Sequence, residues 1–363
     1  MSAARAARPG AARAPGRVER LRFLCSPAAH EGHAGRQAAV QTIETHMSWV
    51  FSVGEHVLKL KKPVRYAYLD FSTLRQREFF CREELRLNER LAPGVYLGLC
   101  ALRWDGRSLA LTPEAALPAG GRTLDWLVLM RRLPREHMLD ALIEREAVQP
   151  AAIDALAEVL IGFFRDAPAL ALAGAQYSAH FSREQAANRD VLLRPAFSLE
   201  GAAHALDRLD AALQGHAGLL HARAAQGRVV DGHGDLRPEH VCLLTRPVVI
   251  DALEFNADLR RVDPLDEIAS LGMECEAAGA AWIGPRLAER CLAALEPRAP
   301  RALLPLYTAY RALLRSRLAA AHLLDAHPRR PEHWLPQARR YLALASRALD
   351  ALEALDAPAG TAL

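Results

Sequence analysis

The chain has no long hydrophobic segment: within its 363 residues, no apolar run approaches the roughly 18 residues that a membrane-spanning helix needs. Its six cysteines are irregularly spaced and form no CxxC pair, which disfavours zinc-finger and dithiol redox sites and favours reduced thiols in a cytoplasmic protein. We expect Cys81 and Cys242, which fall within apolar or helical patterns, to occupy core positions. The sequence also lacks GxxxxGK[ST], so a phosphate-binding P-loop is not expected.

Positive charge is concentrated at the start of the sequence. Residues 1–22 contain six arginines and one glutamate, whereas the whole chain carries a formal charge of only +4. The remainder is therefore close to neutral, which argues against a nucleic-acid-binding surface on the folded body. Residues 1–17 are rich in Ala, Arg, Pro and Gly and lack the apolar core of a secretory signal, so we expect them to be disordered.

The rest of the chain has the composition of a globular protein, with 51% hydrophobic and 24% charged residues overall. Its length is sufficient for two lobes. Strand-like patterns dominate the first part and helical patterns the second. The sequence therefore predicts an α+β fold, with a strand-rich N-terminal lobe over residues 18–130 and a larger, helical C-terminal lobe over residues 131–363.

The segment from Asp231 to Asp251, DGHGDLRPEHVCLLTRPVVID, carries the strongest functional signal. It reads as a short loop bearing His233-Gly234-Asp235, an apolar strand at 241–244, a turn at 245–247 and a second apolar strand at 248–250. Such a hairpin brings Asp235 and Asp251 to the same end. Protein kinases transfer phosphoryl groups with a pair of this kind: one Asp accepts the hydroxyl proton, and a later Asp holds the metal on the ATP phosphates. An ordinary hairpin with solvated acids is the alternative.

Together with its continuation, HGDLRPEHVCLL…VVIDALEFN resembles the catalytic loop of the aminoglycoside phosphotransferase and choline kinase family, whose members have the two-lobed protein-kinase-like fold. Residues 43–64, 69–98 and 255–279 are similar to a bacterial subgroup of phosphotransferase-like proteins, so the resemblance spans most of residues 20–280. It implies ATP-dependent phosphorylation of a hydroxyl group. Some members of the subgroup carry an added P-loop domain, which we expect this chain to lack.

The first lobe supplies candidates for phosphate binding. Strand-like segments at 47–53 and 56–60 flank Gly54 and predict a hairpin. In the second strand, Val57-Leu58-Lys59 is similar to the V-A-I-K strand of kinases, whose Lys pairs with ATP phosphates and with a helix Glu. Alternation places Lys59 and Lys61 on one face. Lys59 is preferred because it directly follows the apolar pair, Lys61 stays open, and a solvated Lys-rich strand end is the alternative.

A helix is predicted from Ser72, as its N-cap, to Leu91, just before Pro93-Gly94. Glu84 shares the helix face that carries Leu87 and Leu91, so this acid needs a partner, and Lys59 on the neighbouring strand would supply one. Glu83 lies about 100° away around the helix and is the fallback. A solvated helix acid is the alternative.

Residues 126–130 predict another strand. In the resembled family such a strand leads into a hinge whose backbone groups bind the adenine edge, which implies Met130 and Arg131 as nucleotide-binding positions. Beyond Pro150 the pattern is helical, with amphipathic segments at 153–164 and 202–213 and a largely helical region at 302–355. Asp266 is expected to cap the next helix or to brace the catalytic loop.

His240 departs from the kinase pattern, which has a metal-binding Asn at this position. Imidazole is a poorer partner for Mg²⁺ than an amide carbonyl. His240 could ligate a softer ion such as Mn²⁺, or Glu239 or Glu254 could supply the missing oxygen. Alternatively, the site could bind nucleotide and transfer slowly or not at all. The predicted metal ligands are Asp251, His240 and Glu254.

The sequence thus predicts a phosphotransferase that uses ATP and Mg²⁺, or Mn²⁺, on a small-molecule hydroxyl acceptor, without a nucleic-acid or membrane partner. Asp235 accepts or orients the hydroxyl proton, and His233 braces this catalytic loop. Asp251 binds the metal, while Lys59 neutralises phosphate charge and Glu84 positions Lys59. Two other classes stay open: a nucleotide-binding pseudokinase, and a metallohydrolase with a ligand set of His233, Asp235, His240 and Asp251.

Overall fold

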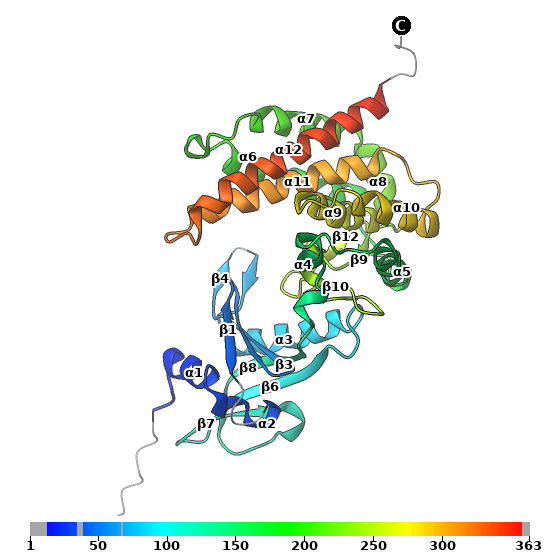
Figure 1. Cartoon of the computed structure of the whole chain (residues 1–363). Coiled ribbons are helices and arrows are strands. Elements are labelled where there is room, and N and C mark those ends of the chain that lie inside the picture. Colours follow the sequence, from blue (N-terminus) through cyan, green and yellow to red (C-terminus); the bar gives the residue numbers. More distant parts are fainter. Residues whose placement is uncertain (1–12, 35–38, 67, 358–363) are drawn as a thin grey trace, which may run out of the picture. The chain divides into compact units, whose positions relative to one another are not determined.

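The computed structural model describes residues 13–34, 39–66 and 68–357, which form two compact units (Figure 1). The first unit comprises the described residues up to Leu133 together with Glu254–Asn256. The second comprises Pro134–Leu253 and the described residues from Ala257 onward. An antiparallel sheet dominates the first unit and helices dominate the second, which confirms the predicted α+β class.

A six-stranded antiparallel sheet with the strand order β1-β2-β3-β8-β6-β7 forms the centre of the first unit. Its strands are β1 (Val40–Glu44), β2 (Ser48–Val53), β3 (His56–Lys61), β6 (Tyr96–Trp104), β7 (Leu109–Pro113) and β8 (Arg122–Arg131). The remaining elements of this unit are the β4–β5 pair (Arg65–Tyr66, Leu69–Asp70), the helices α1 (Arg17–Leu24), α2 (Glu31–Ala34) and α3 (Leu74–Asn88), and the 3₁₀ turns η1 (Pro27–His30) and η2 (Glu114–Ala116). Of the tail predicted to be disordered, residues 1–12 lie outside the described residues, and Arg17 already begins α1.

The hairpin of β2 and β3 confirms the predicted one, with Lys61 added to its second strand. The register pairs Val53 with His56 and Ser48 with Lys61. Gly54 in the turn has a φ of 53°, a left-handed conformation that glycine adopts without steric cost. Gly54 therefore allows the backbone conformation that this turn requires.

Alternation along β3 separates apolar from charged side chains. Leu58 and Leu60 belong to a buried cluster that also contains Leu24 of α1 and Phe51 of β2. The lysines between and after these leucines point to the opposite face, where α3 packs against β8 and β6. This face of the sheet consequently delivers positive charge to α3.

The start of α3 differs from the prediction by one residue. Thr73, not Ser72, is the N-cap, and its hydroxyl accepts a hydrogen bond of 3.2 Å from the N–H of Gln76. Ser72 is instead bound to Asp70, through both its N–H at 2.9 Å and its hydroxyl at 2.6 Å. In the turn before the helix, Ser72 therefore binds Asp70 and Thr73 forms the cap.

Nine α-helices make up most of the described part of the second unit (Figure 1). They are α4 (Leu139–Glu144), α5 (Pro150–Asp166), α6 (Gly174–Leu192), α7 (Ala202–Gly215), α8 (Ala217–Ala225), α9 (Pro264–Ala277), α10 (Ile283–Leu295), α11 (Leu303–Ala321) and α12 (Pro331–Asp356). The 3₁₀ turns are η3 (Arg135–His137), η4 (Pro195–Phe197), η5 (Pro238–His240), η6 (Ala257–Arg260) and η7 (His322–Leu324). The predicted segments 153–164 and 202–213 fall within α5 and α7, and the predicted region 302–355 holds α11 and α12.

The core of the second unit is aromatic where α6, α11 and α12 meet. Phe181 lies edge-on to Tyr310 at 4.7 Å and stacks near Tyr307 at 6.2 Å between ring centroids. Tyr341 of α12 is also buried in this cluster. Each of these large side chains removes much apolar surface from water and so stabilises the packing of α11 against α12, which lie side by side (Figure 1).

Two short strand pairs frame the predicted catalytic loop. β9 (Val230–Asp231) pairs with β12 (Arg261–Val262), and β10 (Val241–Cys242) pairs with β11 (Val248–Val249). The predicted hairpin is therefore present, although each strand is shorter than expected. The loop of residues 232–240 runs from β9 to β10, and Asp251 follows β11.

The cap expected at Asp266 is wrong. Asp263 caps α9 by accepting the N–H of Leu265 at 2.9 Å, and Pro264 occupies the first helical position. Asp266 lies one turn further on and binds Arg311 of α11 at 2.6 Å. Its carboxylate thus ties two helices together.

Cys81 and Cys242 are fully buried free thiols, as expected. Among the described residues, no helix combines the length and apolarity that crossing a membrane requires.

Candidate active site

Glu84 of α3 is the centre of a buried charge cluster in the first unit. Lys59 Nζ lies 3.0 Å from Glu84 Oε1, and Lys61 Nζ lies 2.6 Å from Oε2. Lys61 also donates to the carboxylate of Glu254. A carboxylate withdrawn from water is stable only when charge and hydrogen bonds compensate it, and these lysines do so. The expected pairing of Lys59 with Glu84 is present, and Lys61 joins it.

The two lysines differ in their access to solvent. Lys61 has no exposed side-chain surface, whereas Lys59 keeps 16% of its side chain exposed. Burial lowers the pKa of Lys61, but the carboxylates of Glu254 and Glu84 outweigh this and hold the pKa above its ordinary value. Lys61 is thus a permanently charged internal cation, and Lys59 is the one of the pair that a ligand can approach without breaking the cluster.

Glu83, the fallback, lies elsewhere on the helix. Its carboxylate pairs at 2.7 Å with Arg86 on the exposed side of α3. Sequence reasoning missed the role of Glu254 as a partner of Lys61. A compositional signal was available for the cluster as a whole, because Lys59, Lys61 and Lys62 are the only lysines among 46 basic Lys and Arg residues. Lys, unlike Arg, presents a compact point charge.

The strand β8 ends at the predicted nucleotide-binding positions. Met130 is buried in register with Val57 and Tyr96. The N–H of Arg131 donates to the Val95 carbonyl at 2.8 Å, so this donor is already used within the first unit. The adenine contact at Met130 and Arg131 stays a prediction.

In the second unit, Glu267 of α9 holds the backbone of the loop of residues 232–240, which is the predicted catalytic loop. Its carboxylate accepts the N–H of His233 at 3.0 Å and the N–H of Gly234. Burial raises the pKa of Glu267 to about 7, although the two N–H bonds act in the opposite direction. Sequence reasoning assigned no role to Glu267, because no local pattern links it to a loop more than thirty residues earlier.

His233 is fixed through both ring nitrogens. Nε2 donates to the Ile250 carbonyl at 2.9 Å, and Nδ1 accepts the N–H of Asp235 at 3.3 Å. Burial, aided by the nearby His240, lowers the pKa of His233 to about 4, so the ring is neutral at ordinary pH. With both nitrogens bound to backbone, His233 is arranged as a brace and not as a metal ligand.

Gly234, next to Asp235, has a φ of 87°. A Cβ added there would lie 3.0 Å from a Leu253 methyl group and 3.1 Å from the Leu259 carbonyl oxygen. The loop therefore requires glycine for its conformation and for its close contact with the following segment.

Asp235 presents a partly exposed carboxylate, with 31% of its side chain accessible. Arg237 Nη1 and His240 Nδ1 lie 3.7 Å and 3.8 Å from Oδ2. Burial raises the pKa of Asp235, but Arg237 and His240 outweigh it and hold the pKa below its ordinary value. Asp235 is therefore ionised at neutral pH and able to accept a hydrogen bond from a hydroxyl group.

His240 and Asp251 together can hold a divalent cation. His240 Nδ1 donates to the Asp235 carbonyl at 2.8 Å, which leaves Nε2 facing Asp251 Oδ2 at 3.8 Å. Two ligands at about 2.1 Å from one ion can be separated by such a distance. Asp251 has a φ of 66°, a strained conformation that persists mainly where surrounding structure or function demands it.

Within the part of the chain that the structure describes, no three His, Cys, Asp or Glu side chains gather into a metal-binding group. A pair of ligands fits Mg²⁺, which is commonly bound by one or two carboxylates together with substrate phosphates. It does not fit the metallohydrolase alternative, which needs three or more protein ligands. Glu254, the third predicted ligand, belongs to the first unit and contacts Lys61.

Comparison with known proteins gives one relationship in sequence and several in structure. No family model matches the chain. Proteins of Mycobacterium tuberculosis and Mycobacterium bovis, both named uncharacterized proteins, are 30% identical over 279 residues, which is 76% of this chain and 53% of theirs. The chain therefore spans about half the length of the curated relatives that it matches.

Two solved kinases resemble the structure over nearly its whole length. A choline/ethanolamine kinase family protein from Mesorhizobium loti has a TM-score of 0.53 at 16% identity, covering 90% of this chain and 98% of its own. Choline kinase from Cryptosporidium parvum has a TM-score of 0.53 at 8% identity, covering 88% and 91%. The chain has the protein-kinase-like fold. The fold expected from the sequence resemblance is thus confirmed.

Each of the two units of this fold contains one of the two clusters of charged residues. In the first unit, Lys59 of β3 pairs with Glu84 of α3, and the second unit carries the loop with Asp235 and the hairpin that leads to Asp251. The metallohydrolase alternative offered no reason for the first of these clusters.

Proposed function

We propose that this protein transfers the γ-phosphoryl group of ATP to a hydroxyl group of a small molecule. The observation that carries the proposal is Asp235: an ionised, partly exposed carboxylate on a loop fixed by His233 and Glu267. Such a group is what phosphoryl transfer to an alcohol requires, namely an acceptor for the hydroxyl proton held in a fixed place. The kinases of similar fold, by their names, act on small alcohols, which supports the same class of acceptor.

The first unit supplies the phosphate-binding role in this proposal. Lys59 neutralises charge on the ATP phosphates, and Glu84 orients it. Lys61 keeps Glu84 and Glu254 in place from the inside. This assignment follows from exposure, because Lys59 retains accessible surface and Lys61 has none.

The second unit supplies the acid–base and metal-binding roles. The acceptor oxygen forms a bond to the γ-phosphorus, the bond between this phosphorus and the β,γ-bridging oxygen breaks, and ADP leaves with the electron pair. The hydroxyl proton passes to Asp235. Asp251 and His240 would hold Mg²⁺, or Mn²⁺, which supplies charge neutralisation for the phosphates.

The experiment is a screen of the purified chain for ADP formation from ATP, with pools of small alcohols, sugars, hydroxy acids and amino alcohols. Each pool is tested with Mg²⁺ and with Mn²⁺. Acceptor-dependent ADP formation that Asp235→Asn removes supports the proposal. Acceptor-dependent turnover that persists in Asp235→Asn contradicts the assigned role of this residue.

Nucleotide binding is measured in parallel, because it distinguishes an enzyme from a nucleotide-binding module. A ligand that binds only the native state raises the thermal midpoint. ATP with metal is expected to raise it in the wild type and in Asp235→Asn, but not in Asp251→Ala, which loses the metal-binding carboxylate. A midpoint shift without turnover for any pool would favour the pseudokinase alternative. This alternative stays open because the chain has His240 where the kinase pattern has a metal-binding Asn.

A further inference from the structure

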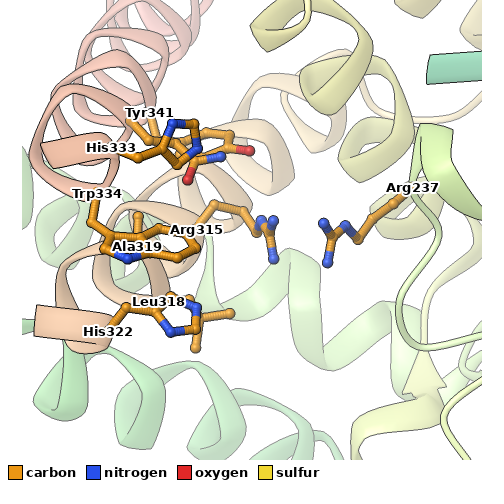
Figure 2. A pocket seen from close by; sticks show the side chains of 9 residues that line it. Arg237, Arg315, Leu318, Ala319, His322, His333, Trp334 and Tyr341 are labelled. Carbon is orange, nitrogen blue, oxygen red and sulfur yellow. The ribbon is translucent and has the colours of Figure 1, made fainter. Parts of the chain in front are cut away.

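The second unit contains a cavity of about 300 Å³ next to the catalytic loop. Two arginines contribute to its lining, Arg237 from the loop and Arg315 from α11. Figure 2 shows their guanidinium groups pointing toward one another across the open space. A cavity of this size accommodates a small metabolite-sized ligand.

The acidic partners of these arginines lie behind or beside them. Arg315 Nε is 2.5 Å from Glu274, whose carboxylate also accepts the hydroxyl of Tyr341 at 2.6 Å. Arg237 pairs with Glu239 and lies 3.7 Å from Asp235. These contacts hold both cations in position, and the other nitrogens of the Arg315 guanidinium face the cavity (Figure 2).

Two guanidinium groups that face each other repel unless an anion or well-ordered water lies between them. Arg237 Nε is also buried without a hydrogen-bond partner among the described residues. Guanidinium groups bind carboxylate and phosphate in a two-pronged manner, with charge-assisted hydrogen bonds. The pair is therefore suited to an oxyanion.

One wall of the cavity is aromatic. Trp334 stacks on His322 with ring centroids 3.9 Å apart and an interplanar angle of 23°. His333 packs edge-on against the same indole at 5.2 Å. The indole N–H is already bound to the Arg329 carbonyl at 2.7 Å, which fixes the ring. These rings can contact the carbon skeleton of a ligand whose charged group is held by the arginines.

The cavity is connected to Asp235 through the chain itself. Arg237 lies two residues after Asp235 and contacts its carboxylate. The charge of Arg315 also contributes to holding the pKa of Asp235 below its ordinary value, so Arg315 lies within electrostatic reach. A ligand in the cavity is thus close to the proposed proton acceptor.

We propose that this cavity receives the phosphoryl acceptor, and that the acceptor carries a carboxylate or phosphate group bound between Arg237 and Arg315. This inference rests on the proposed phosphotransferase function and narrows it to hydroxyl compounds that are themselves anions. A positively charged amino alcohol would meet two arginines in this cavity and be disfavoured.

The first test compares acceptors that differ in charge, using ADP formation by the full chain with ATP and metal. Glycerol 3-phosphate and glucose 6-phosphate represent phosphates, glycerate and gluconate represent carboxylates, glycerol and glucose are neutral, and choline and ethanolamine are cationic. Turnover is expected with anionic acceptors of one of the two kinds, which also identifies the anionic group. Turnover with neutral or cationic acceptors alone would overturn the inference while the proposed function stands.

Arg237→Gln is the main variant, because the side chains of Arg237 and its acidic partner Glu239 are 25% and 38% exposed, so loss of this pair should cost little stability. Its KM for the anionic acceptor is expected to rise about tenfold or more, since a charge-assisted pair is lost, and Arg237→Lys is expected to recover part of the loss. Arg246→Gln, an exposed arginine on the β10–β11 turn, is the matched control and should leave KM unchanged. Equal KM values in Arg237→Gln and the wild type would overturn the inference.

Arg315 is tested as the double variant Arg315→Gln with Glu274→Gln, which removes the buried pair together and avoids an isolated buried charge. It is expected to raise KM like Arg237→Gln. A thermal midpoint above the range of working temperatures establishes that it is folded. A folded double variant with wild-type KM would exclude Arg315 from the acceptor site and overturn the inference.

A binding measurement without ATP separates this inference from the proposed function. Inorganic phosphate is titrated into the metal-free protein while the thermal midpoint is followed. The midpoint is expected to rise in the wild type and Arg246→Gln, and to rise only at about tenfold higher phosphate in Arg237→Gln. A shift that is independent of Arg237 would place the anion elsewhere and overturn the inference. A shift that needs Arg237, without turnover of any acceptor, would retain the anion site but contradict the proposed enzyme.

Discussion

The two units hold their functional charges in opposite ways. In the first, Lys61 and Glu84 are fully buried, and lysine nitrogens contact Glu84 at 2.6 Å and 3.0 Å. In the second, Asp235 and Asp251 keep 31% and 41% of their side chains exposed, and the basic groups around them stand 3.7–3.8 Å away. A tight buried ion pair holds its side chains in place, but each charge is neutralised by its partner and is no longer available to a ligand. Looser, exposed carboxylates keep capacity for a cation or a hydroxyl group.

The two units thus differ in which groups they hold in place, side chains in the first unit and backbone in the second. The first unit stabilises charged side chains directly through other side chains. The second unit fixes the backbone instead, through His233 and Glu267, and leaves the tips of Asp235 and Asp251 accessible. Removal of the fully buried Lys61 in the first unit should therefore affect stability, and substitutions at the tips in the second unit should affect function alone.

The largest expected effect is that of Asp235→Asn. Loss of the proton acceptor should lower kcat by about 10²–10⁴-fold, while the unfolding midpoint and its shift with ATP and metal stay close to those of the wild type. Steady-state ADP formation and thermal unfolding measure the two quantities. Asp207→Asn, an exposed acid paired with Arg189 on the surface, is the control and should change neither. A large loss of stability in Asp235→Asn would mean that the Asp235 carboxylate is part of the structural support of the second unit, and the contrast between the two units would fail.

The next largest effect separates the lysines of the first unit. Lys61→Met leaves two buried carboxylates without their main cation and should lower the free energy of unfolding by about 3–5 kcal/mol. Lys59→Met should cost much less stability, because Lys61 still compensates Glu84, but it should weaken ATP binding. Urea unfolding and nucleotide titration measure these changes.

Lys62→Met serves as the control for this pair. Lys62 is buried and donates to the Thr45 carbonyl at 2.6 Å, but its acidic partner Glu44 has a side chain that is 44% exposed. Water can solvate Glu44 when the lysine is removed, so this loss should cost about 1–2 kcal/mol, less than the loss of Lys61. Equal destabilisation by all three substitutions would break the distinction between a buried and a ligand-facing lysine.

A smaller effect is expected for His240→Asn. Asn offers a carbonyl oxygen where imidazole now faces Asp251, so the ratio of Mg²⁺-supported to Mn²⁺-supported rates should rise severalfold. The ratio is the quantity to compare, because a substitution in this loop can also change the absolute rate through neighbouring hydrogen bonds. An unchanged ratio would mean that His240 does not contact the metal.

The smallest expected effect concerns pH and the backbone supports of the second unit. The pKa of Glu267 is raised from 4.5 to about 7, so its contribution to stability is complete below pH 4.5 and is lost as pH rises toward 7. The pKa of His233 is lowered from 6.5 to about 4, so its contribution is complete above pH 6.5 and is lost as pH falls toward 4. Between these values the two slopes oppose each other.

Glu267→Gln removes one of these slopes. The free energy of unfolding of the variant should rise from pH 4.5 to 6.5 relative to that of the wild type, by no more than about 1.4 kcal/mol per pH unit. Urea unfolding at several pH values measures this difference, with the exposed Glu353→Gln as the control. Parallel pH profiles in variant and wild type would show that Glu267 does not titrate in this range.

Sequence patterns were sufficient wherever the decisive interaction is local. The β2–β3 hairpin depends on Gly54, and the hairpin after Asp235 depends on two short apolar runs around a turn. The pairing of Lys59 with Glu84 followed from alternation in a strand and the face of one helix. These features could be predicted because neighbours in the sequence determine them.

The errors and omissions concern choices that only tertiary contacts decide. Ser72 and Thr73 can both cap a helix, and so can Asp263 and Asp266; Asp70 and Arg311, respectively, engage the residue that does not. The partner of Lys61 lies 193 positions away, at Glu254. Glu267 and Arg315 likewise reach the catalytic loop from distant helices, so no local pattern identified them.

The confinement of lysine to the end of β3 has a chemical consequence. Every side-chain amine of the sequence lies between residues 59 and 62, so an amine-selective reagent would modify these three lysines and leave the other side chains of the protein untouched. Burial grades the three targets, since Lys61 is shielded whereas Lys59 and Lys62 keep 16% and 11% of their side chains exposed. The extent of side-chain acylation therefore reports on these three lysines alone. Protection of Lys59 by a bound nucleotide would be seen as reduced acylation, with no contribution from lysines elsewhere in the protein.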